Sequence, residues 1–399
     1  MEDSKRLQEL TAEVQNAVDA YAKSDDMTNY KELQSHIRRL QVAACTPVDT
    51  LFTFRLQVVG NIAIAMLNEM GVFDALVTKE RATAAELAVS TGFSEPVIAR
   101  LMRLACAQCF CEEIDEQTYR ANQITWCLIQ PGWKGALRWM DIIYPVAADI
   151  RRFLSSTKFA HGDNEQIPTQ TPFEFVHGKT LWKVMEESPE QRLNFDLWMA
   201  ERKKHEENLW QKRYPPLASL SPANLKDDPE AVLMVDVGGA SGSQLINFKA
   251  QFPHLPGRFV LQDLPESIQT VTPTEGVELM AYDFFTPQPI KGARFYYLRS
   301  ILHNWPDKEC AEILRNILSA MDPGYSTLLV DDYVLPSKNA QLRSTIADVH
   351  MMIMFNSSER TSRQYETMMR DAGLGIVAIF PAGVNEESII EIRVAKVHN

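Results

Sequence analysis

The stretch Val232-Leu-Met-Val-Asp-Val-Gly-Gly-Ala-Ser-Gly242 decides the architecture that we expect for the second half of this chain. Its run of apolar residues is typical of a buried parallel strand, and the glycine cluster predicts that the strand ends in a tight turn. Residues Ser243–Gln251 then have the pattern of a helix. A strand, a turn and a helix in this order present free backbone N–H groups beyond the carboxyl end of the strand, where doubly wound sheets bind nucleotide-like ligands.

The spacing of the glycines favours one class of ligand over another. A dinucleotide fingerprint requires Gly-x-Gly-x-x-Gly, but taking Gly238 or Gly239 as its first glycine leaves Ala240 or Ser241 at the second position. This pattern argues against NAD. The spacing Gly-x-Ala-x-Gly that ends at Gly242 suits S-adenosylmethionine (SAM), which carries ribose and adenine but no pyrophosphate. An ordinary glycine turn remains the alternative interpretation of this stretch alone.

Composition and charge limit the class of protein. The chain has 399 residues, of which 45% are hydrophobic and 23% charged, as in a globular protein of two or three domains. Its formal net charge of −12 repels polyanions, so a nucleic-acid partner is disfavoured. Neither an apolar signal segment nor an apolar run approaching the ~20 residues of a membrane span is recognised, which predicts a cytoplasmic protein without a membrane partner.

Six cysteines are too few for a disulfide framework in a chain of this length. The motif Cys106-x-x-Cys109 has no second Cys/His pair at zinc spacing and lies in an apolar, helix-like run. We therefore expect these cysteines to pack in the core rather than to bind metal, and we predict no metal site.

Residues 1–125 read as several helices followed by a winged helix. Apolar residues at helical spacing predict helices at Leu7–Tyr21, Leu33–Val42 and Leu51–Met70. Thr83 and Glu86 have the spacing of a capping box, and Ser94 is expected to cap a helix that runs to Ala107. Two short strands, Phe110–Glu113 and Thr118–Asn122, then flank an acidic turn.

A winged helix raises the hypothesis of DNA binding. Its second helix, Glu95–Gln108, offers only Arg100 and Arg103 among apolar residues, and its wing is acidic. These features favour a dimerisation module, in which amphipathic helices of two identical subunits bury each other.

The remaining chain divides into a helical segment, residues 126–215, and an α/β domain, residues 216–399. The helical segment is rich in Trp, Phe and Met, which form either a core or the wall of a pocket; their number slightly favours the pocket. The α/β domain alternates strands with helices, as a doubly wound sheet does. The last two predicted strands, near Gly375–Phe380 and at Ser388–Ala395, are joined by a short connection through residues 383–387 and should pair antiparallel.

Polar residues follow successive predicted strands. Asp263 ends the second strand, where this architecture places an acid that accepts ribose hydroxyls, and Asp283 with Phe284 follows the third strand, where they suit adenine. His303 follows the fourth strand and can act as a general base near neutral pH, although a capping or core histidine is the alternative. Two further acids, Asp332 and Glu359, follow later elements, and either can orient the imidazole.

These residues lie in motifs through which nearly the whole chain resembles fungal and plant-type class I SAM-dependent O-methyltransferases of small hydroxylated metabolites. The matching motifs are Pro172-Phe-Glu-Phe-Val-His-Gly, Val235-Asp-Val-Gly-Gly, Gln262-Asp-Leu-Pro, Tyr282-Asp-Phe-Phe, Leu302-His-Asn-Trp-Pro-Asp, Val330-Asp-Asp-Tyr-Val-Leu-Pro and Glu359-Arg-Thr. The resemblance implies an α/β, Rossmann-like doubly wound SAM-methyltransferase sheet with an N-terminal α-helical winged-helix dimerisation domain.

The resemblance also implies roles for residues. His303 would be the base, with Asp332 and Glu359 as its orienting acids. The SAM site would comprise Gly238, Gly239, Gly242, Asp263, Leu264, Asp283, Phe284 and Arg299. A flat, apolar pocket for the hydroxylated substrate is expected from Phe195, Trp198, Met199, His350, Met351 and Phe355. The chain departs from the family pattern at Ala240, where glycine is usual, and at Asn304, where aspartate is common.

Two other functions remain open. A fungal branch of this family consists of pericyclases, which bind SAM and catalyse dehydration, cycloaddition or rearrangement without methyl transfer. The third possibility is a catalytically inactive interaction module. The presence of a base with two orienting acids favours methyl transfer, because a pericyclase has no evident use for them.

Overall fold

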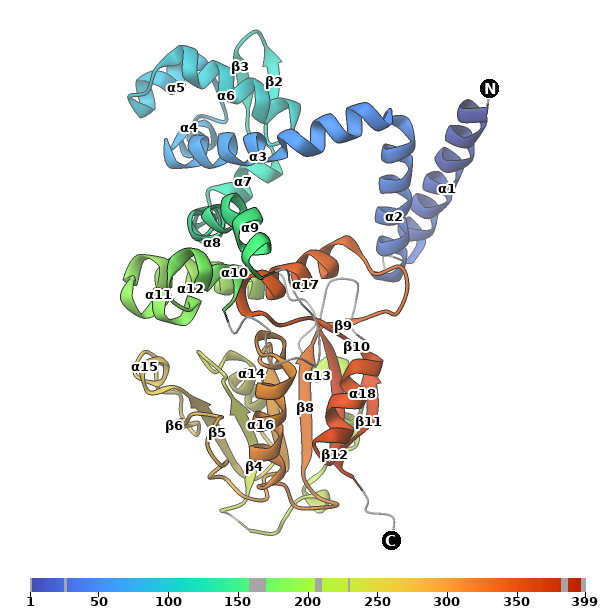
Figure 1. Ribbon diagram of the computed structural model, residues 1–399, viewed down its shortest axis with the longest axis vertical. Helices are drawn as coiled ribbons and strands as arrows, with labels where there is room; N and C mark the ends of the chain where they lie inside the picture. The colour runs from blue at the N-terminus through green and yellow to red at the C-terminus, as the bar shows by residue number, and fades with distance from the viewer. Residues whose placement is uncertain are drawn as a thin grey trace. The chain divides into compact units, whose positions relative to one another are not determined.

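The computed structural model describes residues 2–24, 27–157, 170–204, 210–228, 230–381 and 387–395 (Figure 1). The chain forms two compact units. An N-terminal unit comprises residues 1–149 and 182–206, and a C-terminal unit comprises residues 150–181 and 207–399.

The N-terminal part of the chain is mainly helical. In chain order its elements are α1 (Glu2–Ser24), α2 (Met27–Ala44), α3 (Pro47–Glu69), α4 (Val72–Lys79), β1 (Arg81–Thr83), α5 (Ala84–Thr91), α6 (Glu95–Ala107), β2 (Glu112–Asp115), β3 (Thr118–Arg120), α7 (Gln123–Leu128), α8 (Pro131–Trp139), η1 (Met140–Ile142), α9 (Tyr144–Thr157), α10 (Pro172–His177), α11 (Leu181–Glu187) and α12 (Pro189–Lys204).

A winged-helix arrangement occupies the middle of the N-terminal unit. Its small antiparallel sheet has the strand order β1-β3-β2, next to α5 and α6. The capping box of Thr83 and Glu86 is confirmed. Ser94 occupies the N-cap position of α6 as predicted, although its side chain makes no capping hydrogen bond. The sequence analysis missed β1, which is too short to carry a recognisable alternation.

The Cys106 Sγ atom lies 3.3 Å from the Sγ atom of Cys111, a residue that the C-x-x-C motif does not include. Cys109 is exposed, with a positive φ of 62°. After α6 the chain turns, so that Cys106 lies against Cys111 while Cys109 is at the surface.

The two units do not follow the three consecutive segments 1–125, 126–215 and 216–399. Helix α12 returns to pack along α8, because glycines on α8 let the two helices approach closely. A Cβ atom on Gly132 would lie 2.2 Å from the Cβ of Glu201, and one on Gly135 would lie 2.7 Å from the carbonyl oxygen of Asn194. This packing assigns α12 to the N-terminal unit, while α10 belongs to the C-terminal unit.

Helix α3 exposes an unusual amount of apolar surface. Its buried residues all lie between Gly60 and Asn68, whereas its first half exposes 75% of Val48 and 73% of Phe54. Contrary to the expectation from sequence, α3 is by length and composition apolar enough to cross a membrane. Among the residues that the structure describes, it is the single helix with that property.

The C-terminal unit contains a seven-stranded sheet with the order β11-β12-β8-β7-β4-β5-β6. The strands are β4 (Val232–Val237), β5 (Arg258–Asp263), β6 (Glu278–Ala281), β7 (Phe295–Arg299), β8 (Thr327–Asp332), β11 (Leu374–Phe380) and β12 (Ser388–Val394). Strands β4 to β8 pair in parallel, and the predicted antiparallel pairing of β11 with β12 is confirmed. Residues 382–386 of their connection lie outside the described ranges.

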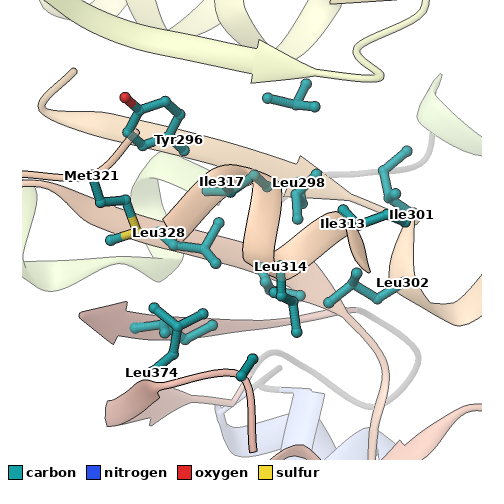
Figure 2. Close-up of a cluster of buried hydrophobic side chains, with 14 of the residues drawn as sticks. Tyr296, Leu298, Ile301, Leu302, Ile313, Leu314, Ile317, Met321, Leu328 and Leu374 are labelled. Atoms are coloured by element: carbon teal, nitrogen blue, oxygen red, sulfur yellow. The ribbon is translucent and has the colours of Figure 1, made fainter. Parts of the chain in front are cut away.

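Helices cover both faces of this sheet. The helices that follow α12 are α13 (Trp210–Arg213), α14 (Ser243–Gln251), α15 (Pro265–Ile268), α16 (Asp307–Leu318), α17 (Leu342–Phe355) and α18 (Ser362–Asp371), with short helical turns η2 (Pro215–Ser219), η3 (Pro222–Asn224) and η4 (Leu302–Asn304). Side chains of α16 and α18 pack on one face, where Ile313 and Ile317 meet Leu298 and Leu328 (Figure 2). Trp210 and α14 cover the other face. The doubly wound prediction is confirmed. The strand order runs outward from β4 to β5 and β6 and then restarts with β7 on the other side of β4, and doubly wound sheets bind ligands at such a switch point.

Candidate active site

The turn after β4 is a cradle that requires glycine. The backbone N–H groups of Gly238 and Gly239 donate to the carbonyl oxygen of Gln262 at 2.8 and 3.1 Å. Gly238 and Gly242 have φ angles of 71° and 72°. A Cβ atom on Gly238 would lie 2.6 Å from Cδ1 of Ile301, and one on Gly239 would lie 2.4 Å from Cδ1 of Leu261. Neither position accepts a larger residue without movement of its neighbours.

Ala240 adopts the conformation that the usual glycine would adopt. Its φ of 50° lies in the left-handed region, which costs a residue with a Cβ roughly 1–2 kcal/mol. The Asp263 carboxylate holds this turn, since its Oδ2 accepts from the N–H of Ala240 at 2.8 Å and its Oδ1 accepts from the N–H of Leu264 at 2.8 Å. Asp263 thus ties the glycine turn to the end of β5.

Phe284 lies beside the same turn. Its Cε1 atom would be 3.8 Å from a Cβ on Gly238, and the Asn316 side chain donates to its carbonyl oxygen at 3.0 Å. The exposed Asp283 accepts from the N–H of Phe285 at 2.9 Å, which shapes the turn after β6. A side-chain-free cradle, an apolar ring and two carboxylates at strand ends fit a nucleoside such as that of SAM.

Arg299 at the end of β7 lies in a buried ionic network. Its guanidinium is 3.5 Å from Oδ2 of Asp331 and 3.5 Å from Oε2 of Glu387. Arg213 pairs with both carboxylate oxygens of Asp331, which also accepts from the Tyr297 hydroxyl at 2.7 Å. The sequence motif could not show that Arg299 binds these two acids.

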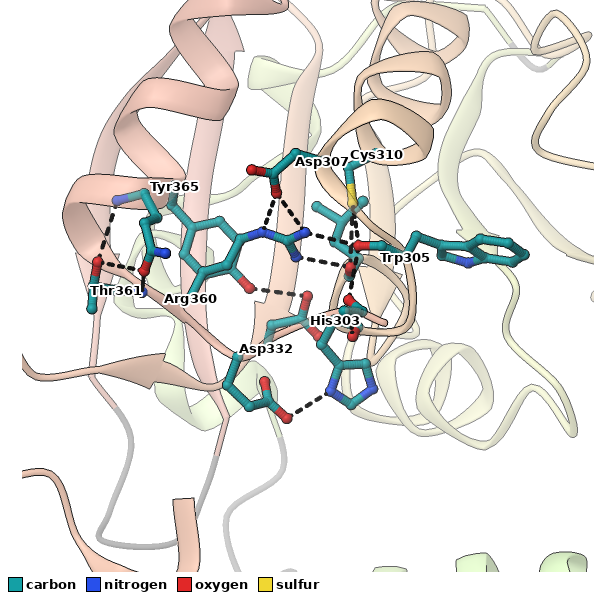
Figure 3. Close-up of polar contacts among 12 residues, drawn as sticks. His303, Trp305, Asp307, Cys310, Asp332, Arg360, Thr361 and Tyr365 are labelled. Atoms are coloured by element: carbon teal, nitrogen blue, oxygen red, sulfur yellow. Dashed lines mark hydrogen bonds and ion pairs between the residues drawn. The ribbon is translucent and has the colours of Figure 1, made fainter. Parts of the chain in front are cut away.

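His303 and Glu359 are joined directly. The Nδ1 atom of His303 lies 2.9 Å from Oε1 of Glu359, and both side chains are buried (Figure 3). A carboxylate can only accept, so Nδ1 carries the hydrogen and Nε2 is the nitrogen that accepts a proton. This contact fits the predicted orienting role of Glu359. His303 lies in η4, and Glu359 directly precedes β10 (Arg360–Thr361).

Opposing influences set the pKa of His303. Burial alone lowers this pKa, but the hydrogen bond to Glu359 and the negative charges of Asp332, Glu359 and Glu387 outweigh it. The net result is a pKa above the ordinary value of 6.5. His303 therefore holds a proton more strongly than an exposed histidine does.

The contact of Asp332 differs from the one expected. Its Oδ2 accepts from the Tyr365 hydroxyl at 3.2 Å, and the structure gives no hydrogen bond from it to His303. Burial raises its pKa to about 7, although the nearby His303 opposes this rise. Asp332 therefore acts on His303 through its charge, because β8 places its carboxylate beside Tyr365 rather than against the imidazole.

Further residues around this pair escaped the sequence analysis. Asp348 accepts from the backbone N–H of Glu359 at 2.9 Å, and the Ser357 hydroxyl lies 2.6 Å from the carbonyl oxygen of His303. Arg360, which is 1% exposed, donates to the carbonyl oxygens of Leu302 and Trp305. Arg360 stands in the Glu359-Arg-Thr motif, but the motif did not indicate that its partners are backbone carbonyl oxygens.

Asn304, the second departure from the family pattern, supports the turn that carries the base. Its side-chain N–H donates to the carbonyl oxygen of Ser300 at 2.9 Å, and Ser300 has a φ of 51°. An aspartate at this position has no hydrogen to donate when ionised.

The expected substrate residues fall into two groups. Phe195, Trp198 and Met199 lie on α12, where the Phe195 ring packs against Trp139 and the Trp198 ring against Trp133, each at 5.0 Å between centroids. His350, Met351 and Phe355 are partly buried residues of α17, a helix in contact with η4. Because the two helices belong to different units, a pocket that they share remains a prediction.

Comparison with known proteins identifies both parts of the chain. Residues 156–375 match the O-methyltransferase domain family, and residues 59–131 match the O-methyltransferase dimerisation domain family. Over 396 residues the chain is 32% identical to demethylsterigmatocystin 6-O-methyltransferase of Aspergillus flavus, covering 95% of this chain and 96% of that protein.

Solved structures agree over almost the whole length. A structure described as a pericyclic reaction enzyme is 29% identical, with a TM-score of 0.84, and covers 97% of this chain and 100% of its own. LepI in complex with SAM matches with a TM-score of 0.83, the same identity and the same coverage.

Proposed function

This chain belongs to the O-methyltransferase family and is a SAM-dependent O-methyltransferase of secondary metabolism. We propose that His303 is its general base and removes the proton from a phenol or enol hydroxyl of the substrate. The observation that carries the proposal is the 2.9 Å contact of His303 Nδ1 with Glu359, which leaves Nε2 to accept a proton.

The proposed reaction is a proton removal at one atom. His303 Nε2 takes the hydrogen of the substrate hydroxyl, and the oxygen becomes a stronger nucleophile as it loses that hydrogen. Bound SAM supplies the methyl group, on a sulfonium that is already a good leaving group. Glu359 stabilises the imidazolium that forms, and general-base help of this kind contributes about 10²- to 10⁴-fold.

For the cofactor we propose the cradle formed by Gly238, Gly239 and Gly242. Asp263 and the neighbouring Leu264 flank it after β5, and Asp283 with Phe284 flanks it after β6. In this proposal the glycine turn accepts the amino-acid part of SAM, the Asp263 carboxylate accepts ribose hydroxyls, and the Phe284 ring packs on adenine. Arg299 then acts indirectly, through its ionic contacts with Asp331 and Glu387.

The substrate is proposed to be a small aromatic, polyketide-like hydroxyl compound. The partly buried α17 residues His350, Met351 and Phe355 would supply a flat, largely apolar wall for it. The Aspergillus flavus relative is named as a demethylsterigmatocystin 6-O-methyltransferase, which supports this class of acceptor.

The test is transfer of an isotope-labelled methyl group. The protein is incubated with methyl-labelled SAM and a panel of aromatic polyketides that carry free hydroxyl groups, and mass spectrometry follows the label. Label in an aryl or enol ether is the expected result. Label that stays in SAM with every acceptor would contradict methyl transfer.

The pericyclase is the second candidate, supported by the likeness to the pericyclic reaction enzyme. In that case SAM is required, a substrate is dehydrated or rearranged, and no label leaves SAM. The rearrangement would also survive His303→Gln. A protein that fails to bind SAM in calorimetry would instead be an inactive interaction module.

We further propose that the protein is a homodimer. The match of residues 59–131 to a dimerisation domain supports this, and so does the exposed apolar surface in the first half of α3. Burial of that surface against a second copy would remove large apolar side chains such as Leu51, Phe52 and Phe54 from water.

A further inference from the structure

We propose that Arg360 is a positioning residue that aligns His303 with Glu359 by holding the backbone of the loop that carries the base. The inference rests on the proposed role of His303 as the base. It concerns a residue that touches neither substrate nor cofactor in the proposed mechanism.

The guanidinium of Arg360 bridges the two ends of the loop around η4. Its Nη1 donates to the carbonyl oxygen of Leu302 at 2.9 Å, and its Nη2 donates to the carbonyl oxygen of Trp305 at 2.8 Å (Figure 3). Its Nε and Nη2 also donate to Oδ1 of Asp307 at 2.9 and 2.7 Å. A single side chain thus donates to backbone carbonyl oxygens on both sides of His303.

The segment that supplies this guanidinium also supplies the orienting acid. Glu359 directly precedes Arg360, and Ser357 lies two residues before Glu359. The Ser357 hydroxyl lies 2.6 Å from the carbonyl oxygen of His303 and 2.8 Å from that of Trp305. Ser357 therefore holds the backbone of His303 itself, while Arg360 holds the backbone of Leu302 and Trp305 on either side of it.

The segment is itself paired with another strand, in a two-stranded sheet separate from the seven-stranded one. Arg360 and Thr361 form β10, which pairs in parallel with β9 (Val334–Leu335), the continuation of β8. Asp348 on α17 accepts from the backbone N–H of Glu359 at 2.9 Å. The β9–β10 pairing and the hydrogen bond to Asp348 therefore fix the backbone at Glu359. Arg360, the next residue, links this fixed backbone to the loop that carries His303.

The chemistry of the contacts explains why arginine is needed. The side chain of Asp307 is 81% exposed, so its ion pair with Arg360 contributes little to stability. Burial of the guanidinium is offset mainly by the two carbonyl oxygens, which its fixed fork reaches at the same time. A lysine ammonium is a single point of donation and cannot span Leu302 and Trp305 in that geometry.

Loosening this loop should affect turnover rather than cofactor binding. Arg360 itself makes no hydrogen bond with the cradle at Gly238–Gly242 among the contacts described, and the loop meets the cradle through the apolar side chain of Ile301 beside Gly238. Displacement of a catalytic group by about 1 Å costs roughly 10²-fold in rate. We therefore expect Arg360→Lys to lower kcat by roughly 10- to 100-fold while the SAM affinity stays within about twofold.

The experiment compares Arg360→Lys and Ser357→Ala with the matched control Arg370→Lys in the full chain. Arg370 lies on α18, is 72% exposed and pairs with Asp371 on the surface. The readout independent of activity is the proton NMR signal of His303 Nδ1–H, which a hydrogen bond to a carboxylate shifts downfield and protects from exchange. The signal is assigned by its loss in His303→Gln.

We expect this signal to weaken or broaden in Arg360→Lys and in Ser357→Ala but to be unchanged in Arg370→Lys. The effects of Arg360→Lys and Glu359→Gln on kcat should also be strongly non-additive, since both act through the same contact. If Arg360→Lys does not fold, Arg360→Gln takes its place, because the shorter amide side chain cannot bridge Leu302 and Trp305; Ser357→Ala then tests the hydroxyl contacts separately.

An unchanged Nδ1–H signal together with an unchanged kcat in a folded variant would overturn the inference. Additive losses in the double variant would also overturn it, since they indicate a general loss of stability. Failure of the proposed function is distinguishable: no acceptor would then be methylated by the unaltered protein, while the NMR signal would still respond to Arg360→Lys.

Discussion

His303 and Glu359 are 56 residues apart in the chain, yet Nδ1 of the histidine and Oε1 of the glutamate lie 2.9 Å from each other in a buried position. The contact selects one tautomer of the imidazole and leaves Nε2 as the atom that changes protonation state. Each of the following predictions about turnover depends on this arrangement.

Replacement of the base is the most direct prediction. His303→Gln should lower kcat by about 10²- to 10⁴-fold, because the glutamine amide does not accept a proton near neutral pH. The affinity for SAM, measured by calorimetry, should be unchanged. His254→Gln, at an exposed position, serves as the control. Normal methylation of the true substrate by His303→Gln would exclude His303 as the base.

The pH profile should respond to Glu359→Gln. His303 acts in its neutral form, so activity falls as pH drops through its pKa, which lies above 6.5. Removal of the Glu359 charge and hydrogen bond lowers that pKa, and the acid limb of the kcat/KM profile should therefore move to lower pH. The plateau should fall as well, since an amide does not favour one tautomer. Glu366→Gln on α18 should leave the profile in place.

Asp332 should make stability depend on pH. Its folded-state pKa of about 7 lies above the ordinary value of 3.8, mainly because of burial. The stability that it contributes is therefore fully present below 3.8 and is lost as pH rises to about 7. Asp332→Asn removes this loss, so its Tm relative to the unaltered protein should rise through that window. A difference in Tm that stays constant with pH, as expected for the exposed control Asp371→Asn, would contradict the prediction.

The glycine cradle should not tolerate a side chain. In Gly238→Ala the new Cβ would lie 2.6 Å from Cδ1 of Ile301, at a φ of 71°. The resulting strain of about 1–2 kcal/mol should weaken SAM binding roughly tenfold in calorimetry. Gly375→Ala is a suitable control, because no atom lies within 4 Å of its Cβ position. Equal SAM affinities for both variants would remove the cradle from the cofactor site.

Assembly should depend on the exposed half of α3. Phe52→Asp and Phe54→Asp place charges on side chains that are 61% and 73% exposed in one subunit. If a second copy covers them, sedimentation should change from a dimer to a monomer at micromolar concentration. Val377→Asp, on the edge strand β11 and 56% exposed, should leave the assembly unchanged. A dimer that persists in both α3 variants would place the interface elsewhere.

The sequence predicts the α/β half of this fold well, because its signals are local. The apolar run before Gly238 is β4, and Asp263 ends β5 as expected. The alternation of strands with helices indicated a doubly wound sheet, although the strand order was not predicted. The pairing of α8 with α12 could not be predicted in this way, because Gly132 and Gly135 acquire their meaning only when Glu201 and Asn194 lie against them.

The site shows the same division. His303 and Glu359 were recognisable because their side chains are chemically distinctive and stand in motifs. The partners of Arg360 are backbone carbonyl oxygens of Leu302 and Trp305, which every residue possesses, so no pattern of side chains could reveal them. The bond of Asp332 to Tyr365 depends on how β8 and α18 pack, a relationship that no spacing encodes.

The parallel pairing of β9 with β10 has a consequence for how this enzyme diversifies. Val334 pairs with Arg360 and Leu335 with Thr361, so the chain leaves the sheet before α17 and returns to the same place after it. In the proposed substrate site, mutations of exposed α17 residues would alter which acceptor is chosen, while the β9–β10 pairing holds Glu359 near His303. Selection for new substrates can therefore proceed separately from selection for the reaction.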